Sequence, residues 1–168
     1  MSRLVRGLVA GAFGTLAMSG VAATVRRTVS PEAPFGETHY ERVGVAVTAL
    51  ARGVDLEVAA ADPGAILDLP TRRRLGEALH MVFGMLNGAA LALAVDEPRV
   101  GHGAALGVGL WFAGFAGHLP ALKVTEGIAS MTTQERWRTM ASHVTYGVTT
   151  ALVLTAFRRT RRTGHEHR

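Results

Sequence analysis

The fold is decided by residues 78–122, which read ALHMVFGMLNGAALALAV (78–95), DEPR (96–99) and VGHGAALGVGLWFAGFAGHLPAL (100–122). The first and third of these segments contain no Lys, Arg, Asp or Glu. In a helix that rises about 1.5 Å per residue, each can cover the roughly 30 Å hydrocarbon core of a bilayer, with local thinning or snorkelling for the shorter one. The charged tetrapeptide between them is typical of a tight turn. This stretch therefore predicts a helical hairpin that crosses a membrane twice.

Two more uncharged segments lie near the ends of the chain, GLVAGAFGTLAMSGVAATV (7–25) and MASHVTYGVTTALVLTAF (140–157). Arginines flank both of them, as they commonly flank membrane-spanning helices at the headgroups. We therefore predict an all-α fold, a four-span transmembrane helical bundle that forms a single membrane domain. The expected boundaries are spans at about 4–25, 75–95, 100–122 and 139–157, a long polar connector at 26–74 and a polar tail at 158–168.

The connector at 26–74 carries charges of both signs and contains Pro31 and Pro34 near its start, so we do not expect it to cross the bilayer. Its apolar segment 43–51 is too short to span the membrane. We expect this segment to form a surface helix that lies against the headgroups or caps the bundle.

The composition excludes several classes of protein. The 168 residues include no cysteine, which excludes disulfides, thiolate metal sites and cysteine nucleophiles. The net charge of +5 owes much to arginines next to apolar segments, so we expect contact with the lipid bilayer and no binding to nucleic acid. The first segment has the basic start of a signal peptide, but it is longer than a usual signal core and ends in Arg26 and Arg27. We therefore expect it to be the first span.

Glycines recur inside the predicted spans at intervals of three or four residues. In lipid, small residues on one helix face let two backbones approach closely and gain dispersion and weak hydrogen bonds. We predict that these glycines serve helix packing, and a homo-oligomer or a membrane-protein partner is a further expectation. The residues assigned to this role are Gly7, Gly11, Gly14, Gly84, Gly88, Gly103, Gly107 and Gly147.

The second and fourth spans share a pattern, a histidine followed by an aromatic residue at the third position and a glycine at the fourth. It occurs as His80, Phe83 and Gly84, and again as His143, Tyr146 and Gly147. The repetition is typical of a duplicated helical hairpin, but helix packing alone also selects such stripes. Both explanations stay open at this point.

Three histidines fall at one depth of the predicted bundle. Because the third span runs opposite to the second and fourth, His80, His118 and His143 lie on the same side, roughly 8 Å inside the boundary marked by basic residues. Ionisable groups within a membrane usually face the bundle interior or a water-filled cavity. We expect Glu77, one turn before His80, on the same face. These four residues are the predicted polar or metal site.

The connector adds secondary candidates from the same side of the membrane. Glu37, His39 and Glu41 alternate along the sequence, so an extended segment would point all three in one direction. Four interpretations of the histidines stay open. They are hydrogen bonds to neighbouring carbonyls without any cofactor, a pathway for protons or a polar substrate, a divalent metal site, and haem ligation by His80 and His143.

Three features resemble small bacterial inner-membrane proteins of the YagU type, a family of unknown function. They are the segment GAFGTLAM (11–18), the proline-bearing connector after it, and the two spans with the His-x-x-aromatic-Gly pattern, which together cover roughly half of the chain. The resemblance implies a four-span bundle in the bacterial plasma membrane. It implies no catalytic residues.

No phosphate-binding loop, nucleophile elbow or zinc-protease motif occurs in the sequence, so we assign no catalytic residues and do not expect an enzyme. A non-enzymatic membrane bundle or accessory subunit is the first functional hypothesis. The alternatives are a small transporter or proton-coupled protein with a polar path at the histidine level, and a haem- or metal-binding membrane protein. The dense arginines of the tail favour cytoplasmic termini.

Overall fold

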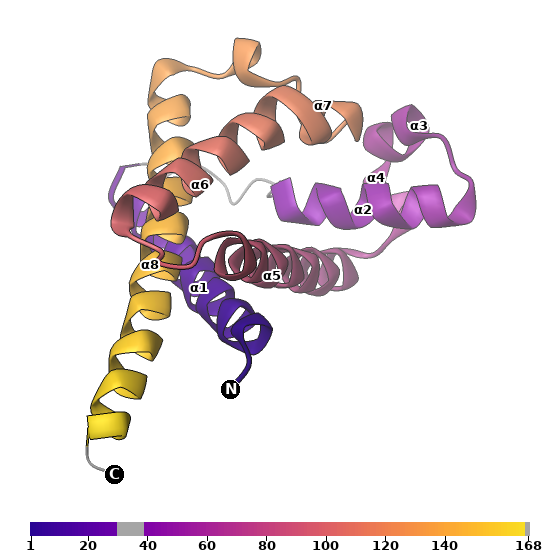
Figure 1. Ribbon diagram of the computed structural model, residues 1–168. Helices are drawn as coiled ribbons and strands as arrows, with labels where there is room; N and C mark the ends of the chain where they lie inside the picture. Colours follow the sequence, from indigo (N-terminus) through magenta and orange to yellow (C-terminus); the bar gives the residue numbers. More distant parts are fainter. Residues whose placement is uncertain (30–38, 167–168) are drawn as a thin grey trace.

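The computed structural model describes residues 1–29 and 39–166, and every regular element in this part of the chain is helical (Figure 1). In chain order the elements are α1 (Arg3–Val29), α2 (His39–Arg52), α3 (Leu56–Ala61), α4 (Pro63–Ile66), α5 (Leu69–Ala94), α6 (Val100–Ala113), the π-helical turn η1 (Gly114–His118), α7 (Leu119–Ala121), the 3-10 turn η2 (Ile128–Ser130) and α8 (Thr133–Glu166).

In the part of the chain that the structure describes, four stretches of helix are long and apolar enough to cross a membrane. They are Arg3–Thr24 in α1, Leu69–Ala94 in α5, Val100–Ala121 through α6, η1 and α7, and Thr133–Arg159 in α8. The prediction of an all-α bundle with four such helices is therefore confirmed. α8 also continues as a helix to Glu166, through most of the predicted polar tail.

α5 begins before the predicted span because Asp68 caps it. The Asp68 carboxylate accepts hydrogen bonds from the Thr71 backbone N–H at 2.8 Å and from the Thr71 hydroxyl at 3.0 Å, and Pro70 occupies the first turn, where its missing N–H costs nothing. The arginines at 72–74 therefore belong to the first turns of α5 instead of the connector.

We expect Asp68→Ala to lower the thermal unfolding temperature of the purified protein at neutral pH. The bonds from Thr71 lower the pKa of the Asp68 carboxyl below its ordinary value of 3.8, because they favour its charged form. This stabilisation is complete above the ordinary pKa and is lost as the pH falls through the lowered one. Thermal unfolding of wild type and variant, followed from neutral to strongly acidic pH, checks the prediction.

Asp68→Asn is the matched control, because its amide oxygen can still accept a hydrogen bond but its charge does not titrate. It should keep part of the stability at every pH. Equal unfolding temperatures of wild type and Asp68→Ala at neutral pH would contradict the capping role.

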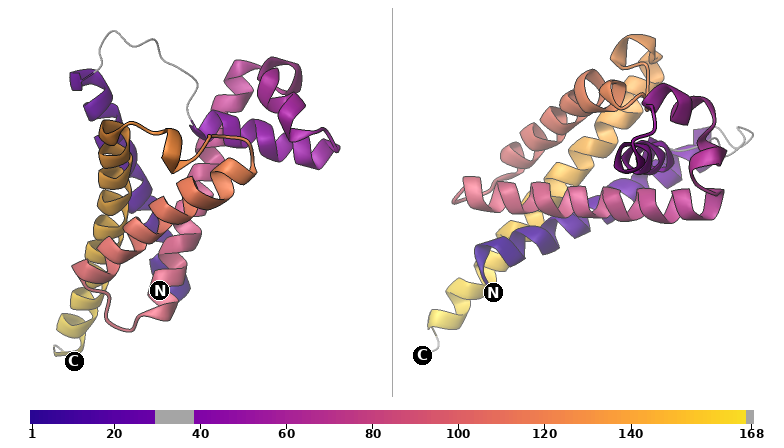
Figure 2. Two further views of the ribbon diagram at one scale, coloured as in Figure 1. Left: turned by 90° about the horizontal axis from the view of Figure 1, so that it is seen from above. Right: turned by 90° about the vertical axis from the view of Figure 1, so that its right-hand side faces the viewer.

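The bundle is closed at one end and splayed at the other. α1 packs against α5 and α8, and α6 packs against α8. α5 and α6 diverge from the short turn that joins them, and α2 lies beside α5 toward the splayed end (Figure 2). An ion pair from Arg3 to Asp96 and a 3.0 Å hydrogen bond from the Thr155 hydroxyl to the Pro98 carbonyl join α1 and α8 to this turn.

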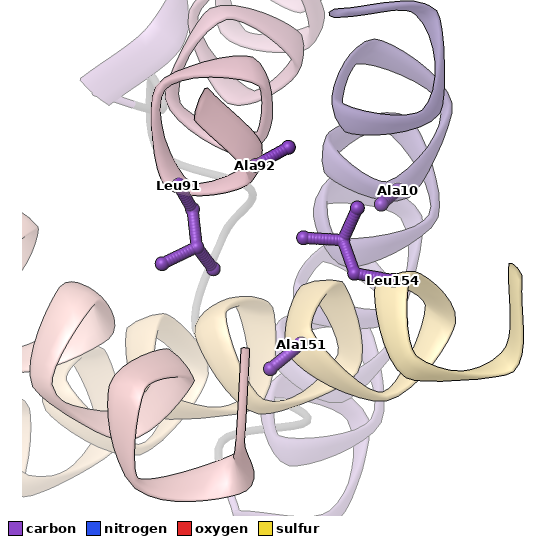
Figure 3. Close-up of a cluster of buried hydrophobic side chains, with 5 residues drawn as sticks. All are labelled: Ala10, Leu91, Ala92, Ala151 and Leu154. Atoms are coloured by element: carbon purple, nitrogen blue, oxygen red, sulfur yellow. The ribbon is translucent and has the colours of Figure 1, made fainter. Parts of the chain in front are cut away.

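A small apolar cluster fills the closed end of the bundle. It joins α1, α5 and α8 through buried side chains that pack side by side, which Figure 3 shows. Its members are Ala10, Leu91, Ala92, Ala151 and Leu154. None of these side chains is polar, so the part of the bundle nearer the termini has an apolar core.

The glycines predicted for helix packing all lie at crossings between helices of this one chain. A Cβ atom at any of them would collide with the backbone or a side chain of a neighbouring helix. At Gly88, for example, it would stand 2.5 Å from the Gly7 carbonyl oxygen. α1 crosses α5 at Gly7, Gly11, Gly84 and Gly88, α1 meets α8 at Gly14, and α6 crosses α8 at Gly103, Gly107 and Gly147.

The connector contains a helix, as predicted, but α2 is longer than the apolar segment and packs on α5. Its buried face includes Gly44, Val45 and Ala49, and the last two join Ala59 of α3 in a second apolar cluster. Gly76 of α5 allows the approach, since a Cβ there would stand 2.5 Å from the Tyr40 carbonyl carbon. α2 therefore covers one side of α5 at the splayed end of the bundle.

Candidate functional site

A cavity of about 590 Å³ lies between the splayed spans. Its wall is built from α1, α2, α5, α6, η1, α7 and α8. The wall residues of α5 run from Gly76 to Leu86, through the middle of that helix, and those of α8 lie in its first half. The cavity therefore reaches from the end of the bundle that lies away from the termini to about the middle of α5. The apolar cluster of Figure 3 contributes no residue to the cavity wall.

Four histidines, His39, His80, His118 and His143, line this cavity. They come from four different elements, α2, α5, η1 and α8. The three histidines predicted at one depth thus share one space, and His39 joins them from the connector.

The acidic candidates do not join this group. Glu77 is exposed and is not part of the cavity wall. Glu41 is buried, and its Oε1 lies 3.0 Å from the Arg73 Nε. The prediction that His39 and Glu41 share one side of an extended segment is wrong, because α2 begins at His39 and residues two apart face different sides of a helix. Glu37 lies outside the described residues.

His80 has a polar atom that the described part of the chain leaves without a hydrogen bond. Its ring stacks on the ring of Tyr40, with centroids 4.1 Å apart and an interplanar angle of 29°. Its Nε2 is buried and has no hydrogen-bond partner among the described residues. Leaving a polar atom buried in this way costs free energy, and such atoms in proteins are usually paired with protein, water or ligand. The ring is therefore held against Tyr40 with one buried nitrogen that has no partner among the described residues.

His143 has a fixed orientation and a defined tautomer. Its Nδ1 lies 2.8 Å from the Thr139 carbonyl oxygen. A carbonyl can only accept, so Nδ1 carries a proton and donates it, and in the neutral ring Nε2 is then an acceptor. The predicted hydrogen bond from a histidine to a neighbouring carbonyl is thus present at Nδ1 of His143. Its Nε2 can still accept a hydrogen bond.

The third span changes its winding where it meets the cavity. η1 is a π-helical turn from Gly114 to His118. Such turns are rare in proteins as a whole, and those that occur are often found at functional sites. Pro120 follows closely and cannot donate to the carbonyl four residues before it. The turn brings the buried ring of Phe115 to 5.5 Å from that of His39 and to 6.0 Å from that of His143.

The hydroxyl groups in the wall donate to carbonyls of the helices. The Thr15 hydroxyl donates to the Gly11 carbonyl at 2.9 Å, the Ser142 hydroxyl to the Arg138 carbonyl at 3.0 Å, and the Tyr146 hydroxyl of α8 to the Gly84 carbonyl of α5 at 2.6 Å. Two of these bonds lie within one helix and the third joins two helices. The protons of these three hydroxyls are therefore engaged, and their oxygens can still accept hydrogen bonds from a ligand.

No Lys, Arg, Asp or Glu of the described chain belongs to the cavity wall. The closest cation along α2, Arg42, bonds the Val124 carbonyl at 3.3 Å instead. Loss of solvent, and next the charge of Arg42, lower the pKa of His39 below its ordinary value of 6.5, which favours a neutral ring at neutral pH. A ligand in this cavity would meet aromatic and aliphatic side chains, hydroxyl groups and imidazoles, and no fixed charge among the described wall residues.

The described cavity wall lacks a group of three ligands for a metal ion. Among the described residues no group of three or more His, Asp or Glu side chains has an arrangement that could hold a metal ion. Haem would add two carboxylates, and the described wall offers no cation to pair with them. These observations favour an uncharged organic molecule over the two cofactors predicted as alternatives.

Several wall residues were missed in the sequence, among them Tyr40, Phe115 and Ser142. Tyr40 lies in the connector, whose path the sequence does not give, and Phe115 is turned inward by η1. Pro120 was the one available signal, because a proline near the end of a helix disturbs the winding before it.

Searches against protein-family models, curated proteins and solved structures found no match, so the likeness to the YagU type stays a prediction.

Proposed function

We propose that this chain is a non-enzymatic, multi-pass membrane protein that binds an uncharged, lipid-soluble molecule in the cavity between its spans. The observation that carries the proposal is the gathering of four histidines around a space of about 590 Å³ that contains no fixed charge among its described wall residues. Pockets of this size that are mostly apolar, with a few convergent polar groups, are typical of small-molecule sites.

The apolar part of the wall supports a ligand that comes from the bilayer. Val82 and Leu86 of α5 line the cavity and yet are 52% and 58% exposed, so they lie at its edge. Leu110 of α6 also lines the cavity, and α5 and α6 diverge from the turn that joins them (Figure 2). In a membrane this edge would be covered by lipid, and an apolar ligand could pass between α5 and α6 without entering water.

Transport across the membrane is supported less well than binding. A path for protons or a polar substrate needs polar groups or water along its whole length. The histidines lie in one half of the bundle, and the other half contains the apolar cluster around Ala10 and Leu91. The same cluster would have to separate for any through passage to form.

The proposal also covers the membrane in which the protein lies and the partners that it binds. A bacterial plasma membrane with cytoplasmic termini remains our expectation from the arginine distribution and the family resemblance. An accessory role with a protein partner, or a homo-oligomer, would use surfaces other than the predicted packing glycines, because those glycines already pack within this chain.

Filling the cavity should remove the bound molecule. Gly114 belongs to the wall, and a Cβ there would meet only His118 and Leu119 side-chain atoms, at 3.7 to 3.9 Å. We expect Gly114→Phe to place its ring in the cavity and to exclude most of the ligand. Protein purified from native membranes in mild detergent can be extracted with organic solvent, and mass spectrometry then measures the bound molecules per protein.

Gly109→Phe is the matched control, because it lies in the same span and a Cβ there meets nothing within 4 Å. It should retain the molecule that the wild type carries. Equal amounts of the same molecule in both variants would show that it binds outside the cavity, and wild-type protein without any specific lipid-soluble molecule would contradict the proposal.

A further inference from the structure

The cavity also indicates the chemical class of its ligand, and this inference rests on the proposed function. We propose that it binds a hydroquinone, an aromatic ring with two hydroxyl groups, that carries an apolar tail. Charge, ring geometry, hydrogen bonding and the position of the apolar edge each narrow the choice.

The headgroup must be uncharged. A phosphate or carboxylate would be taken out of water without a partner, because no cation lines the described wall. Desolvation of an unpaired ion is far more costly than that of a hydroxyl or a carbonyl. Phospholipids and fatty-acid anions therefore fit the site poorly, and neutral lipid-soluble molecules fit it well.

The walls around the histidines are aromatic. Tyr40 stacks on His80, Phe115 stands edge-on to His39, and the rings of Phe83 and His118 are 5.8 Å apart. Such rings pair with another planar ring through stacked or edge-to-face contacts, which stabilise it beyond its buried area. A flat aromatic headgroup uses this wall better than a flexible glycerol does.

The hydrogen-bonding groups select a donor. Nε2 of His143 accepts in the neutral ring because Nδ1 already donates to Thr139. Nε2 of His80 is buried and unbonded among the described residues, and a neutral imidazole can present it as an acceptor. Two hydroxyl groups on one ring can donate to both nitrogens. The oxidised quinone has only carbonyl acceptors, so it would leave the acceptor on His143 unpaired.

The apolar edge provides the way out for a tail. Val82 and Leu86 line the cavity from the exposed face of α5. A chain attached to the ring would leave between α5 and α6 and continue in lipid. This geometry matches a molecule that diffuses within the bilayer and places its ring at the depth of the histidines.

Binding of three synthetic probes to the purified full chain tests this inference. They are decylhydroquinone, kept reduced without oxygen, its dimethyl ether, and decylbenzoquinone. The ether keeps the ring and tail but has lost both O–H donors. We expect the hydroquinone to bind at least about tenfold more tightly than either of the others, the difference that one or two hydrogen bonds make. Calorimetric titration in detergent measures the three affinities.

Two variants locate the bound probe. His80→Phe keeps an aromatic ring beside Tyr40 but removes the nitrogen, and it should reduce the preference for the hydroquinone over its ether. Gly114→Phe should abolish binding of all three probes, and Gly109→Phe should not. Because the comparison among probes is made on wild-type protein, it stands even if a variant fails to fold.

The outcomes separate this inference from the proposed function. If the ether binds as well as the hydroquinone and Gly114→Phe still abolishes binding, the cavity takes neutral lipid-soluble molecules but the hydroquinone assignment is wrong. If the quinone binds most tightly, the assignment of His143 as an acceptor is wrong. If no probe binds and native protein carries no extractable molecule, both proposals fail.

Discussion

Replacing Gly107 with alanine should destabilise the protein by about 1–3 kcal/mol, the range found when an extra carbon is forced into close packing. The new Cβ would stand 2.7 Å from the carbonyl carbon of His143 and 2.8 Å from the Cα of Val144. Both are backbone atoms of α8, so the two spans must move apart. Thermal or denaturant unfolding in detergent, followed by circular dichroism, measures the loss.

Gly109→Ala is the control within the same helix. A Cβ at this position meets nothing within 4 Å, and alanine favours a helix more than glycine does. We expect this variant to unfold at the wild-type temperature or above it. If Gly107→Ala and Gly109→Ala were equally stable, the close crossing of α6 and α8 would be disproved.

Replacing His80 with phenylalanine should have the opposite effect on the protein freed of bound lipid. The variant removes a buried, unbonded nitrogen and keeps an aromatic ring beside Tyr40. Removing an unsatisfied buried group recovers its desolvation cost, which is about 1–3 kcal/mol. We therefore expect a higher unfolding temperature together with weaker ligand binding, a combination typical of functional polar groups.

His143→Phe provides the comparison, because the native ring donates a 2.8 Å hydrogen bond to the Thr139 carbonyl. This variant loses a satisfied interaction and should gain no stability. An unfolding temperature lowered equally by both substitutions would mean that His80 is a structural residue, and the argument for a ligand at its Nε2 would fail.

The spans could be predicted from the sequence because burying a charge in lipid is costly. Membrane-spanning helices therefore appear as long segments without Lys, Arg, Asp or Glu. Their starts were harder to place. α5 begins at Leu69 because Asp68 caps it, so the arginines that seemed to end the connector lie in the helix. α8 begins at Thr133, after Thr132 and Glu135 exchange the bonds of a capping box.

The shared depth of the histidines followed from the alternating direction of the spans. Their convergence did not, because depth says nothing of rotation about a helix axis. Glu77 shows the limit of the argument: it lies one turn from His80, yet that small rotation turns it to the surface. His39 lies at the cavity because α2, which belongs to the connector, packs on α5. The pattern of the spans alone does not predict this contact.

The winding of the third span could not be read from hydropathy. Val100–Ala121 contains no Lys, Arg, Asp or Glu and is consistent with one regular helix, but η1 interrupts it, and Phe115 within η1 is buried. A π-helical turn depends on tertiary contacts that pattern and composition do not contain.

The most direct test of the central claim is a high-resolution density map of the protein purified from native membranes into lipid nanodiscs. Our account predicts non-protein density in the cavity, within hydrogen-bonding distance of the Nε2 atoms of His80 and His143, with an apolar extension between α5 and α6. A collapsed cavity in which a protein group bonds His80 Nε2 would contradict it, and the chain would then be a packed bundle without this binding site.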